Sequence, residues 1–180
     1  MYLKSIILIM FMVSVCRARD PLPDMTDPEF QQDCLKTTND YRSRHQAPPV
    51  TIDPKIVEYA KSRCQLESQF HRLDNHHRGL DKHLYGENFA WKGNSEDVVG
   101  TCKQALEKWY KEGLNYDYDN PGTSHNTGHF SQLVWVGSSQ MGCARCYGKG
   151  DKYYETYVVC DYHPPGNIRG EYQDNVLPEQ

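Results

Sequence analysis

Imidazole and carboxylate side chains are the groups in this sequence best suited to chemistry. The chain contains eight histidines and 24 acidic residues. Two neutral imidazoles beside two carboxylates form either a site for a borderline divalent cation such as Zn²⁺ or an acid/base pair that moves protons. A third possibility is a buried polar network whose members satisfy one another and order a loop. Local sequence does not show which histidines come together.

Other catalytic motifs are missing from the sequence. It contains no HExxH zinc motif, no GxSxG nucleophile elbow, no phosphate-binding loop and no GxGxxG fingerprint. Ser124 and His125 are adjacent on a Gly-rich turn, where neighbouring side chains rarely point at each other. Cys143 and Cys146 have CxxC spacing, but no second CxxC or HxxxH follows to complete a zinc site. Enzymatic activity is therefore not the expected function.

The charge balance indicates which classes of binding partner are not expected. The 24 acidic and 20 basic residues give a formal net charge of −4, and the chain contains no run of five or six like charges. Nucleic acids and anionic membranes require clustered Lys and Arg. We therefore expect neither as a partner.

Residues 1–18 are typical of a signal peptide. Lys4 precedes an apolar stretch over residues 6–15, and small residues Cys16 and Ala18 end the segment. The apolar stretch is shorter than the roughly 20 residues that span a membrane. We expect a secreted, extracellular protein, not a membrane protein. Removal of Cys16 from the seven cysteines leaves six, which predicts three disulfides among fifteen possible pairings.

Periodicity divides the rest of the chain into helices followed by strands. Residues 19–26 are expected to be a loose lead-in, and residues 171–180 a tail. Helices are predicted from Asp27–Pro28 to before Pro48, from Pro54 to about residue 68, and from a Ser95 cap to about residue 112. Residues 69–94 have no sustained period and are read as irregular. FSQLVWV, MGCARCY and KYYETYVVCDY predict a three-strand antiparallel meander, so the fold class is α+β.

Four segments of this sequence resemble the motifs of a known family. GHFSQLVWVGS, residues 128–138, is similar to the first signature of the CAP superfamily, which joins cysteine-rich secretory, antigen 5 and plant pathogenesis-related class-1 proteins (SCP/TAPS). YVVCDYHPPGNI, residues 157–168, resembles the second signature, with Asp161 where the family usually has Asn, Gln, Arg, His or Ser. GENF, residues 86–89, is similar to a third motif. The fourth, normally HNxxR, appears as TNDYR over residues 38–42, without its first His.

The resemblance implies a fold, a disulfide pairing and a cleft. The fold would be a single CAP domain over residues 27–170, an α-β-α sandwich with a central antiparallel sheet, of the secreted venom-allergen-like branch. The implied disulfides are Cys64–Cys146, Cys143–Cys160 and Cys34–Cys102. The cleft would hold a tetrad of His71, Glu87, Glu112 and His129 and bind Zn²⁺ or another divalent cation, without an organic cofactor. His76 and His77 compete with His71 for the first place.

The loop before the first signature resembles the sterol-binding loop of sterol-exporting fungal relatives. Tyr116 and Tyr118 hold the first two aromatic places, Pro121 follows, and Thr123 stands at the third. The alternative is that both tyrosines are turn residues packed on the sheet edge. Other relatives bind a fatty acid in an apolar groove between helices.

The expected function is therefore binding of an apolar ligand, sterol or fatty acid, together with a divalent cation in the cleft. One alternative is a hydrolase that uses His71, Glu87, Glu112 and His129. Another is an extracellular signalling or immune-modulating ligand for a host or cell-surface protein. We expect a monomer or weak dimer.

Overall fold

The computed structural model describes residues 19–70, 84–122 and 126–180. The predicted signal peptide and the histidine candidates His71, His76 and His77 lie outside these residues, as does Thr123. No helix within the described ranges is long and apolar enough to cross a membrane.

Two long helices open the fold. Helix α1 (Pro28–Arg44) begins at the predicted cap, where the Asp27 side chain accepts a hydrogen bond from the Phe30 N–H at 2.7 Å. Helix α2 (Pro54–Phe70) follows the short strand β1 (Thr51–Ile52). Both helices begin at the proline of an Asp-Pro pair. Proline is favoured at the first helical position because the backbone N–H that it lacks would have no partner within the helix. These two predicted helices are confirmed within a few residues.

The sheet has four strands in the order β1-β3-β4-β2. Strands β3 (Gln140–Lys149) and β4 (Tyr154–His163) form the predicted antiparallel hairpin. Strand β2 (Gly86–Asn94) pairs antiparallel with β4, and β1 joins β3 in parallel.

The prediction of a strand over residues 130–136 is wrong. Residues 128–133 form helix α4 (Gly128–Leu133), and a turn follows. Phe130, Ser131, Gln132 and Leu133 are all buried, so no solvent-facing side reveals the helical period. A short apolar run of this kind cannot be assigned to strand or helix by periodicity.

Two further element predictions require correction. The residues read as irregular over 69–94 include the whole of β2. The third helix, α3 (Cys102–Lys111), begins seven residues after the predicted Ser95 cap. Thr101 and Gln104 form its capping box, in which each side chain accepts a hydrogen bond from the other residue's backbone N–H. A 3₁₀ turn (Glu112–Asn115) continues it, and helix α5 (Tyr172–Asn175) lies near the C-terminus.

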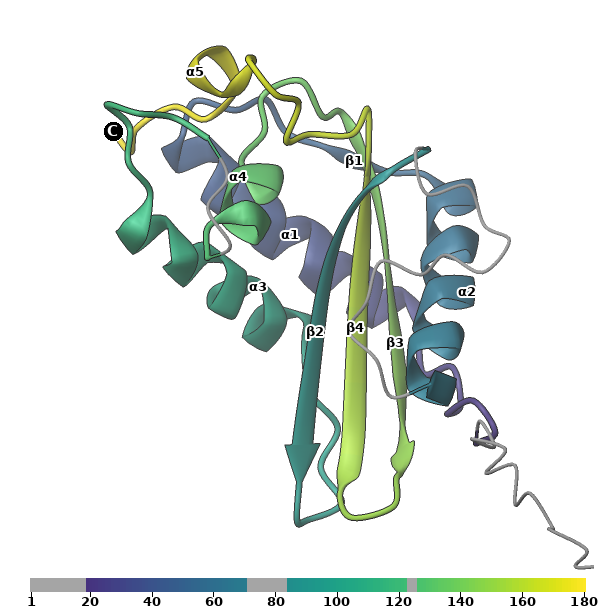
Figure 1. The fold of residues 1–180 in the computed structure, drawn as a ribbon. Coiled ribbons are helices and arrows are strands. Elements are labelled where there is room, and N and C mark those ends of the chain that lie inside the picture. Colours follow the sequence, from purple (N-terminus) through teal and green to yellow (C-terminus); the bar gives the residue numbers. More distant parts are fainter. Residues whose placement is uncertain (1–18, 71–83, 123–125) are drawn as a thin grey trace, which may run out of the picture.

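The helices cover both faces of the sheet, which gives the α-β-α sandwich (Figure 1). Helix α2 packs on one face, where Ala60 and Cys64 meet Tyr157 and Val159. Helices α1, α3 and α4 cover the other face around a larger core that includes Trp109, Phe130 and Leu133. The fold class predicted from the sequence is confirmed.

The implied disulfides are those of the structure, and they join elements within and between these layers. Cys34–Cys102 joins α1 to α3, Cys64–Cys146 joins α2 to β3, and Cys143–Cys160 joins β3 to β4.

Both ends of the described chain pack against the domain, and this includes residues 19–26, for which a loose lead-in was expected. Leu22 is buried and its N–H donates to Ser68 Oγ at 3.0 Å. The Met25 N–H donates to the Arg145 carbonyl of β3 at 2.7 Å. Tyr172 and Val176 belong to the larger core.

Arg42 organises the loops around α4. Its guanidinium is fully buried and donates to the carbonyls of Leu133, Trp135 and Ser138 at 3.2, 2.8 and 2.8 Å, and to that of Pro48 at 2.8 Å. The neighbouring Asn39 side chain exchanges two hydrogen bonds with the Val50 backbone, at 2.9 and 3.0 Å. Asn39 and Arg42 of the TNDYR segment therefore hold neighbouring backbone segments in place.

Candidate functional site

Two of the predicted tetrad residues form a hydrogen-bonded pair. Glu112 follows the last residue of α3, and His129 is the second residue of α4. The Glu112 Oε1 atom lies 2.7 Å from His129 Nδ1, and Oε2 accepts from the His129 and Phe130 N–H groups at 3.0 and 3.3 Å. One carboxylate thus caps α4 and orients the imidazole. Thr127, at the N-cap position, makes no side-chain cap of its own.

The His129 side chain is partly accessible to solvent. Its ring stacks near Trp109 with centroids 5.9 Å apart, and its carbonyl accepts from Asn88 Nδ2 at 2.9 Å. The side chain is 40% exposed. Within the described residues its Nε2 atom makes no hydrogen bond. Since Glu112 occupies Nδ1, the tautomer with a free Nε2 lone pair is favoured, which is the arrangement of a metal ligand or a general base.

Glu87 is held by a different partner. Arg63, fully buried on α2, donates from Nε and Nη2 to the Glu87 carboxylate at 2.6 and 2.8 Å, and it also pairs with Glu67 at 2.9 Å. Burial lowers the pKa of the Arg63 guanidinium, but the hydrogen bond and charge of Glu87 outweigh it and leave the pKa raised. Such a bidentate pair fixes the carboxylate in one orientation.

Asp161 lies directly opposite Glu87 in the β2–β4 pair. Its side chain is fully buried, and neither carboxyl oxygen has a hydrogen-bond partner in the part of the chain that the structure describes. Burial raises the pKa of Asp161 well above its ordinary value, and the Glu87 charge raises it further, while Arg63 lowers it. Two adjacent carboxyl groups and one shared guanidinium therefore favour a neutral Asp161.

The three described tetrad residues do not converge into one group. Across residues 19–70, 84–122 and 126–180, the only set of three or more potential ligand atoms lying within 4.8 Å of one another is that of four disulfide cysteines. Glu112 and His129 form one pair, and Glu87 forms another with Arg63. The remaining tetrad position, predicted at His71 with His76 and His77 as competitors, lies outside the described residues.

Sequence reasoning missed Arg63, although a signal for it exists. Arg63 follows Ile56 and Ala60 on the buried face of α2 and precedes the buried Glu67. A charged residue at an apolar-face position is rarely buried without a partner. Its position therefore indicates a buried opposite charge, here Glu87.

The aromatic loop after α3 borders a separate cavity of about 310 Å³. Tyr118 lines it and is 37% exposed, and Leu114 beside it is 88% exposed. Tyr110 and Phe130 form the inner wall, with ring centroids 5.9 Å apart. Tyr116 instead lies in the core, 5.6 Å from the Phe130 ring, and burial raises its pKa to about 12. Pro121 is half-buried and is not part of the cavity wall.

Polar groups stand at the edge of this cavity. Lys111 and Glu179 line it with opposite charges. His45, also in the wall, is fixed by Tyr110 Oη at 3.0 Å from Nε2 and by the Leu177 carbonyl at 2.7 Å from Nδ1. The cavity thus combines rigid aromatic walls, an exposed leucine and a charged rim.

Comparison with known proteins agrees with this architecture. Residues 35–162 match the model of CAP, the cysteine-rich secretory protein family. Golgi-associated plant pathogenesis-related protein 1 of Homo sapiens is 31% identical over 152 residues, covering 83% of this chain and 94% of that protein. The crystal structure of NaASP2 with Zn²⁺ superposes with a TM-score of 0.62 and 21% identity, covering 88% of this chain and 90% of that one. Venom allergen-like protein 4 of Schistosoma mansoni superposes with a TM-score of 0.56 and 19% identity, covering 86% and 97%. This chain belongs to the CAP family.

Proposed function

We propose that this CAP domain is an extracellular binding protein for an apolar lipid, a sterol or a fatty acid, and that the cavity beside Tyr118 is its binding site. The observation that carries the proposal is the exposed Leu114 beside a pre-formed aromatic cavity. Leu114 is 88% exposed and lies beside Tyr118, Tyr110 and Phe130. Its apolar surface is removed from water when a ligand covers it, and this burial is favourable.

The size and chemistry of the cavity support this proposal. Its volume of about 310 Å³ lies at the small end of ligand pockets, which suits an alkyl chain or part of a sterol. Stacking between Tyr41 and Tyr110, with centroids 3.9 Å apart, stiffens the wall, so little ordering is needed on binding. Lys111 and Glu179 at the rim can contact the polar end of such a lipid.

A lipid extraction tests the proposal. We expect mass spectrometry of a solvent extract to find a stoichiometric sterol or fatty acid in protein purified from a eukaryotic secretion host. The Leu114→Ser/Tyr118→Ala variant should lose most of it, because both apolar contacts are at the cavity. A Val98→Ser/Ile168→Ser variant, which changes two other exposed apolar residues, should keep it. Equal lipid in all three proteins, or an empty wild type, would contradict the proposal.

Divalent cation binding at His129 is a second candidate function, favoured by the Glu112–His129 pair. A carboxylate on Nδ1 that leaves Nε2 available is the usual arrangement around a zinc-bound imidazole, and His129 has such a carboxylate and a side chain that is 40% exposed. His129 and Glu112 fit this role as ligand and orienting group, whereas Glu87 is engaged by Arg63. The NaASP2 structure with Zn²⁺ is a relative in fold in which zinc is present.

Thermal unfolding with added Zn²⁺ tests this second function. We expect Zn²⁺ at pH 7.5 to raise the melting temperature of the wild type and not that of His129→Ala, because a ligand that binds only the folded state stabilises it. Glu112→Gln should require about 10- to 100-fold more Zn²⁺, as for other lost orienting groups. His163→Ala removes a histidine on β4 and should respond like the wild type. A shift that persists in His129→Ala would place the ion elsewhere.

A further inference from the structure

Tyr118 is the most exposed tyrosine in the described part of the chain. It is 37% exposed, whereas every other tyrosine of residues 19–70, 84–122 and 126–180 is buried or half-buried. It stands in the loop after the 3₁₀ turn, where Asp117, Asp119 and Asn120 are exposed as well. Within the described residues the Tyr118 hydroxyl forms no hydrogen bond. Its phenolic oxygen is therefore a nucleophile that a second protein can reach.

Two carboxylates flank this phenol along the chain. Asp117 and Asp119 are its immediate neighbours, and no other tyrosine of the sequence has an acidic residue on both sides. The Asp117 carboxylate accepts hydrogen bonds from the Asp119 and Asn120 N–H groups at 3.0 and 3.2 Å, which forms a turn. The turn therefore presents an acidic, exposed segment with Tyr118 at its centre.

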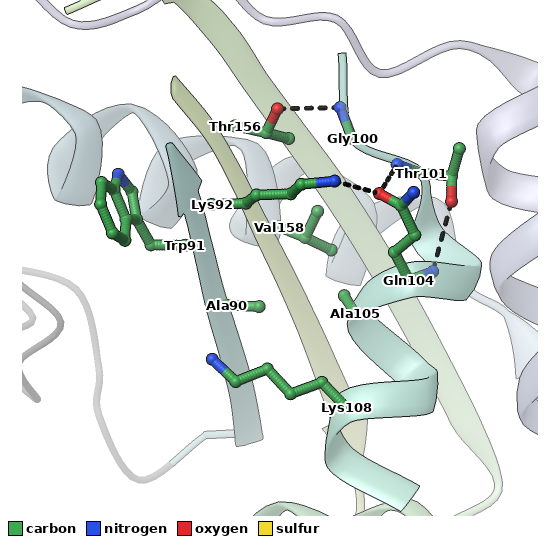
Figure 2. A pocket seen from close by; sticks show the side chains of 10 residues that line it. All are labelled: Ala90, Trp91, Lys92, Gly100, Thr101, Gln104, Ala105, Lys108, Thr156 and Val158. Atoms are coloured by element: carbon green, nitrogen blue, oxygen red, sulfur yellow. Dashed lines mark hydrogen bonds between the residues drawn. The ribbon is translucent and has the colours of Figure 1, made fainter. Parts of the chain in front are cut away.

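Basic residues are absent from the sequence around this loop. Residues 112–144 contain three acidic residues and no Lys or Arg. Two lysines stand in the last turn of α3. Lys108 extends toward β2 across the cavity between α3 and the sheet (Figure 2), and Lys111 lines the cavity beside Tyr118. The loop itself is negatively charged.

Other tyrosines with one acidic neighbour differ in burial or in surrounding charge. Tyr116 precedes Asp117, but it is 7% exposed and belongs to the core. Tyr154 precedes Glu155, but Glu155 is paired with Arg19, and the Lys149 ammonium lies over the Tyr154 ring at 4.4 Å. Exposure and acidic neighbours on both sides therefore coincide at Tyr118.

We propose that Tyr118 is a site of tyrosine O-sulfation by a sulfotransferase that uses a nucleoside phosphosulfate as donor. Tyr118 Oη attacks the donor sulfur, so that a new O–S bond forms while the bond from sulfur to the phosphate oxygen breaks. The phenolic proton passes to a base of the transferase, and the donor leaves as a nucleoside phosphate. No group is oxidised or reduced.

Electrostatics explains why the acidic loop favours this reaction. A transferase that holds so anionic a donor needs a positively charged cleft, and the carboxylates beside Tyr118 steer the segment into it. The product is a sulfate ester between two aspartates, which places three consecutive negative charges at residues 117–119. The inference rests on the secreted route of the proposed function and is independent of any bound lipid.

Sulfate incorporation during secretion tests this inference on the full chain. We expect the wild type, secreted from a eukaryotic host grown with radiolabelled sulfate, to carry label that Tyr118→Phe lacks. Tyr116→Phe should keep it. Trypsin cleavage after Lys111 and Arg145 gives a peptide whose only tyrosines are Tyr116 and Tyr118, so tandem mass spectrometry of this peptide locates the group. The host's own secreted proteins, labelled in the same medium, show that its sulfotransferase is active.

Two double variants test the contribution of the flanking carboxylates. Asp117→Asn/Asp119→Asn should lower the label about tenfold, because the steering charges are lost while an amide oxygen at residue 117 can still accept the hydrogen bonds of the turn. Asp40→Asn/Glu58→Gln removes the same charge at exposed sites on α1 and α2 and should keep the label.

Other results would overturn the inference. Wild-type protein that reaches the medium without label would refute it alone, because its presence there agrees with the secreted route and the lipid extraction is a separate measurement. Label that persists in Tyr118→Phe would place sulfate elsewhere. Phosphate in place of sulfate on the tryptic peptide would identify a different transferase. Equal loss of label in the two acidic double variants would show an effect of net charge and not of this loop.

Discussion

Replacing Arg42 by methionine should lower the free energy of unfolding by about 3–4 kcal/mol, because several buried carbonyls lose their donor at once. The guanidinium donates to four carbonyls, three of which lie in the segment that runs from Leu133, the last residue of α4, to Ser138. Burial lowers the pKa of Arg42 to about 10, so it is still charged at neutral pH, and its hydrogen bonds to the carbonyls are charge-assisted. Urea denaturation at pH 7 measures the loss.

Two variants on the same helix serve as comparisons for Arg42→Met. Arg44→Met removes an exposed guanidinium that lies over the Tyr41 and Tyr110 rings at 5.3 and 5.7 Å, and should cost less than about 1 kcal/mol. Arg42→Lys keeps the charge but lacks the planar fork, so it should recover only part of the stability. If Arg42→Met and Arg44→Met lose equal stability, the carbonyl contacts of Arg42 do not carry the effect.

Replacing Asp161 by asparagine should stabilise the protein at neutral pH, in contrast to most core substitutions. In the folded protein, burial and the charge of Glu87 raise the pKa of Asp161 above that of the unfolded chain. The folded state therefore binds more protons than the unfolded state above the ordinary carboxyl pKa of about 3.9, and stability falls as pH rises through that range. Asparagine has a similar shape and no charge at any pH.

The pH dependence distinguishes this explanation from simple repacking. Near pH 3, below the carboxyl pKa of the unfolded chain, Asp161 is mostly protonated in both states, so wild type and Asp161→Asn should differ little. The advantage of the variant should grow with pH, by up to about 1.4 kcal/mol per pH unit over the range in which Asp161 is protonated in the folded protein and ionised in the unfolded chain. Asp151→Asn, an exposed site in the β3–β4 turn, should show no such trend in urea denaturation from pH 3 to 8. A less stable Asp161→Asn at pH 8 would show that the fold holds the carboxylate ionised.

Much of the architecture follows from local patterns in the sequence. The Asp-Pro starts of α1 and α2 and the hairpin of β3 and β4 are predictable because caps, turns and side-chain periods are local properties. Helix α4 is different: its first turn is capped by Glu112, seventeen residues away from His129, and all its later residues are buried. Strand β2 likewise depends on its pairing with β4. Its glycines and polar residues give no strand pattern from which this pairing could be predicted.

Part of the candidate site could also be predicted from the sequence, and part could not. Motif resemblance predicts Glu112 and His129, which the structure brings together, and it predicts Glu87. The motif resemblance does not indicate that Arg63 of α2 binds Glu87, because the two residues are 24 positions apart in the sequence. The unusual Asp161 is visible in the sequence as a departure from the second signature. Only the register of β2 and β4 shows that Asp161 is a second carboxyl group directly opposite Glu87.

The three disulfides have a consequence for resistance to proteases. Their loops overlap along the chain, since Cys34–Cys102, Cys64–Cys146 and Cys143–Cys160 together span every peptide bond between residues 34 and 160. A single backbone cut anywhere in that range therefore leaves two pieces that are still covalently joined. A nicked molecule keeps its mass under non-reducing conditions and separates into fragments only after reduction, so one cleavage does not release any part of the domain.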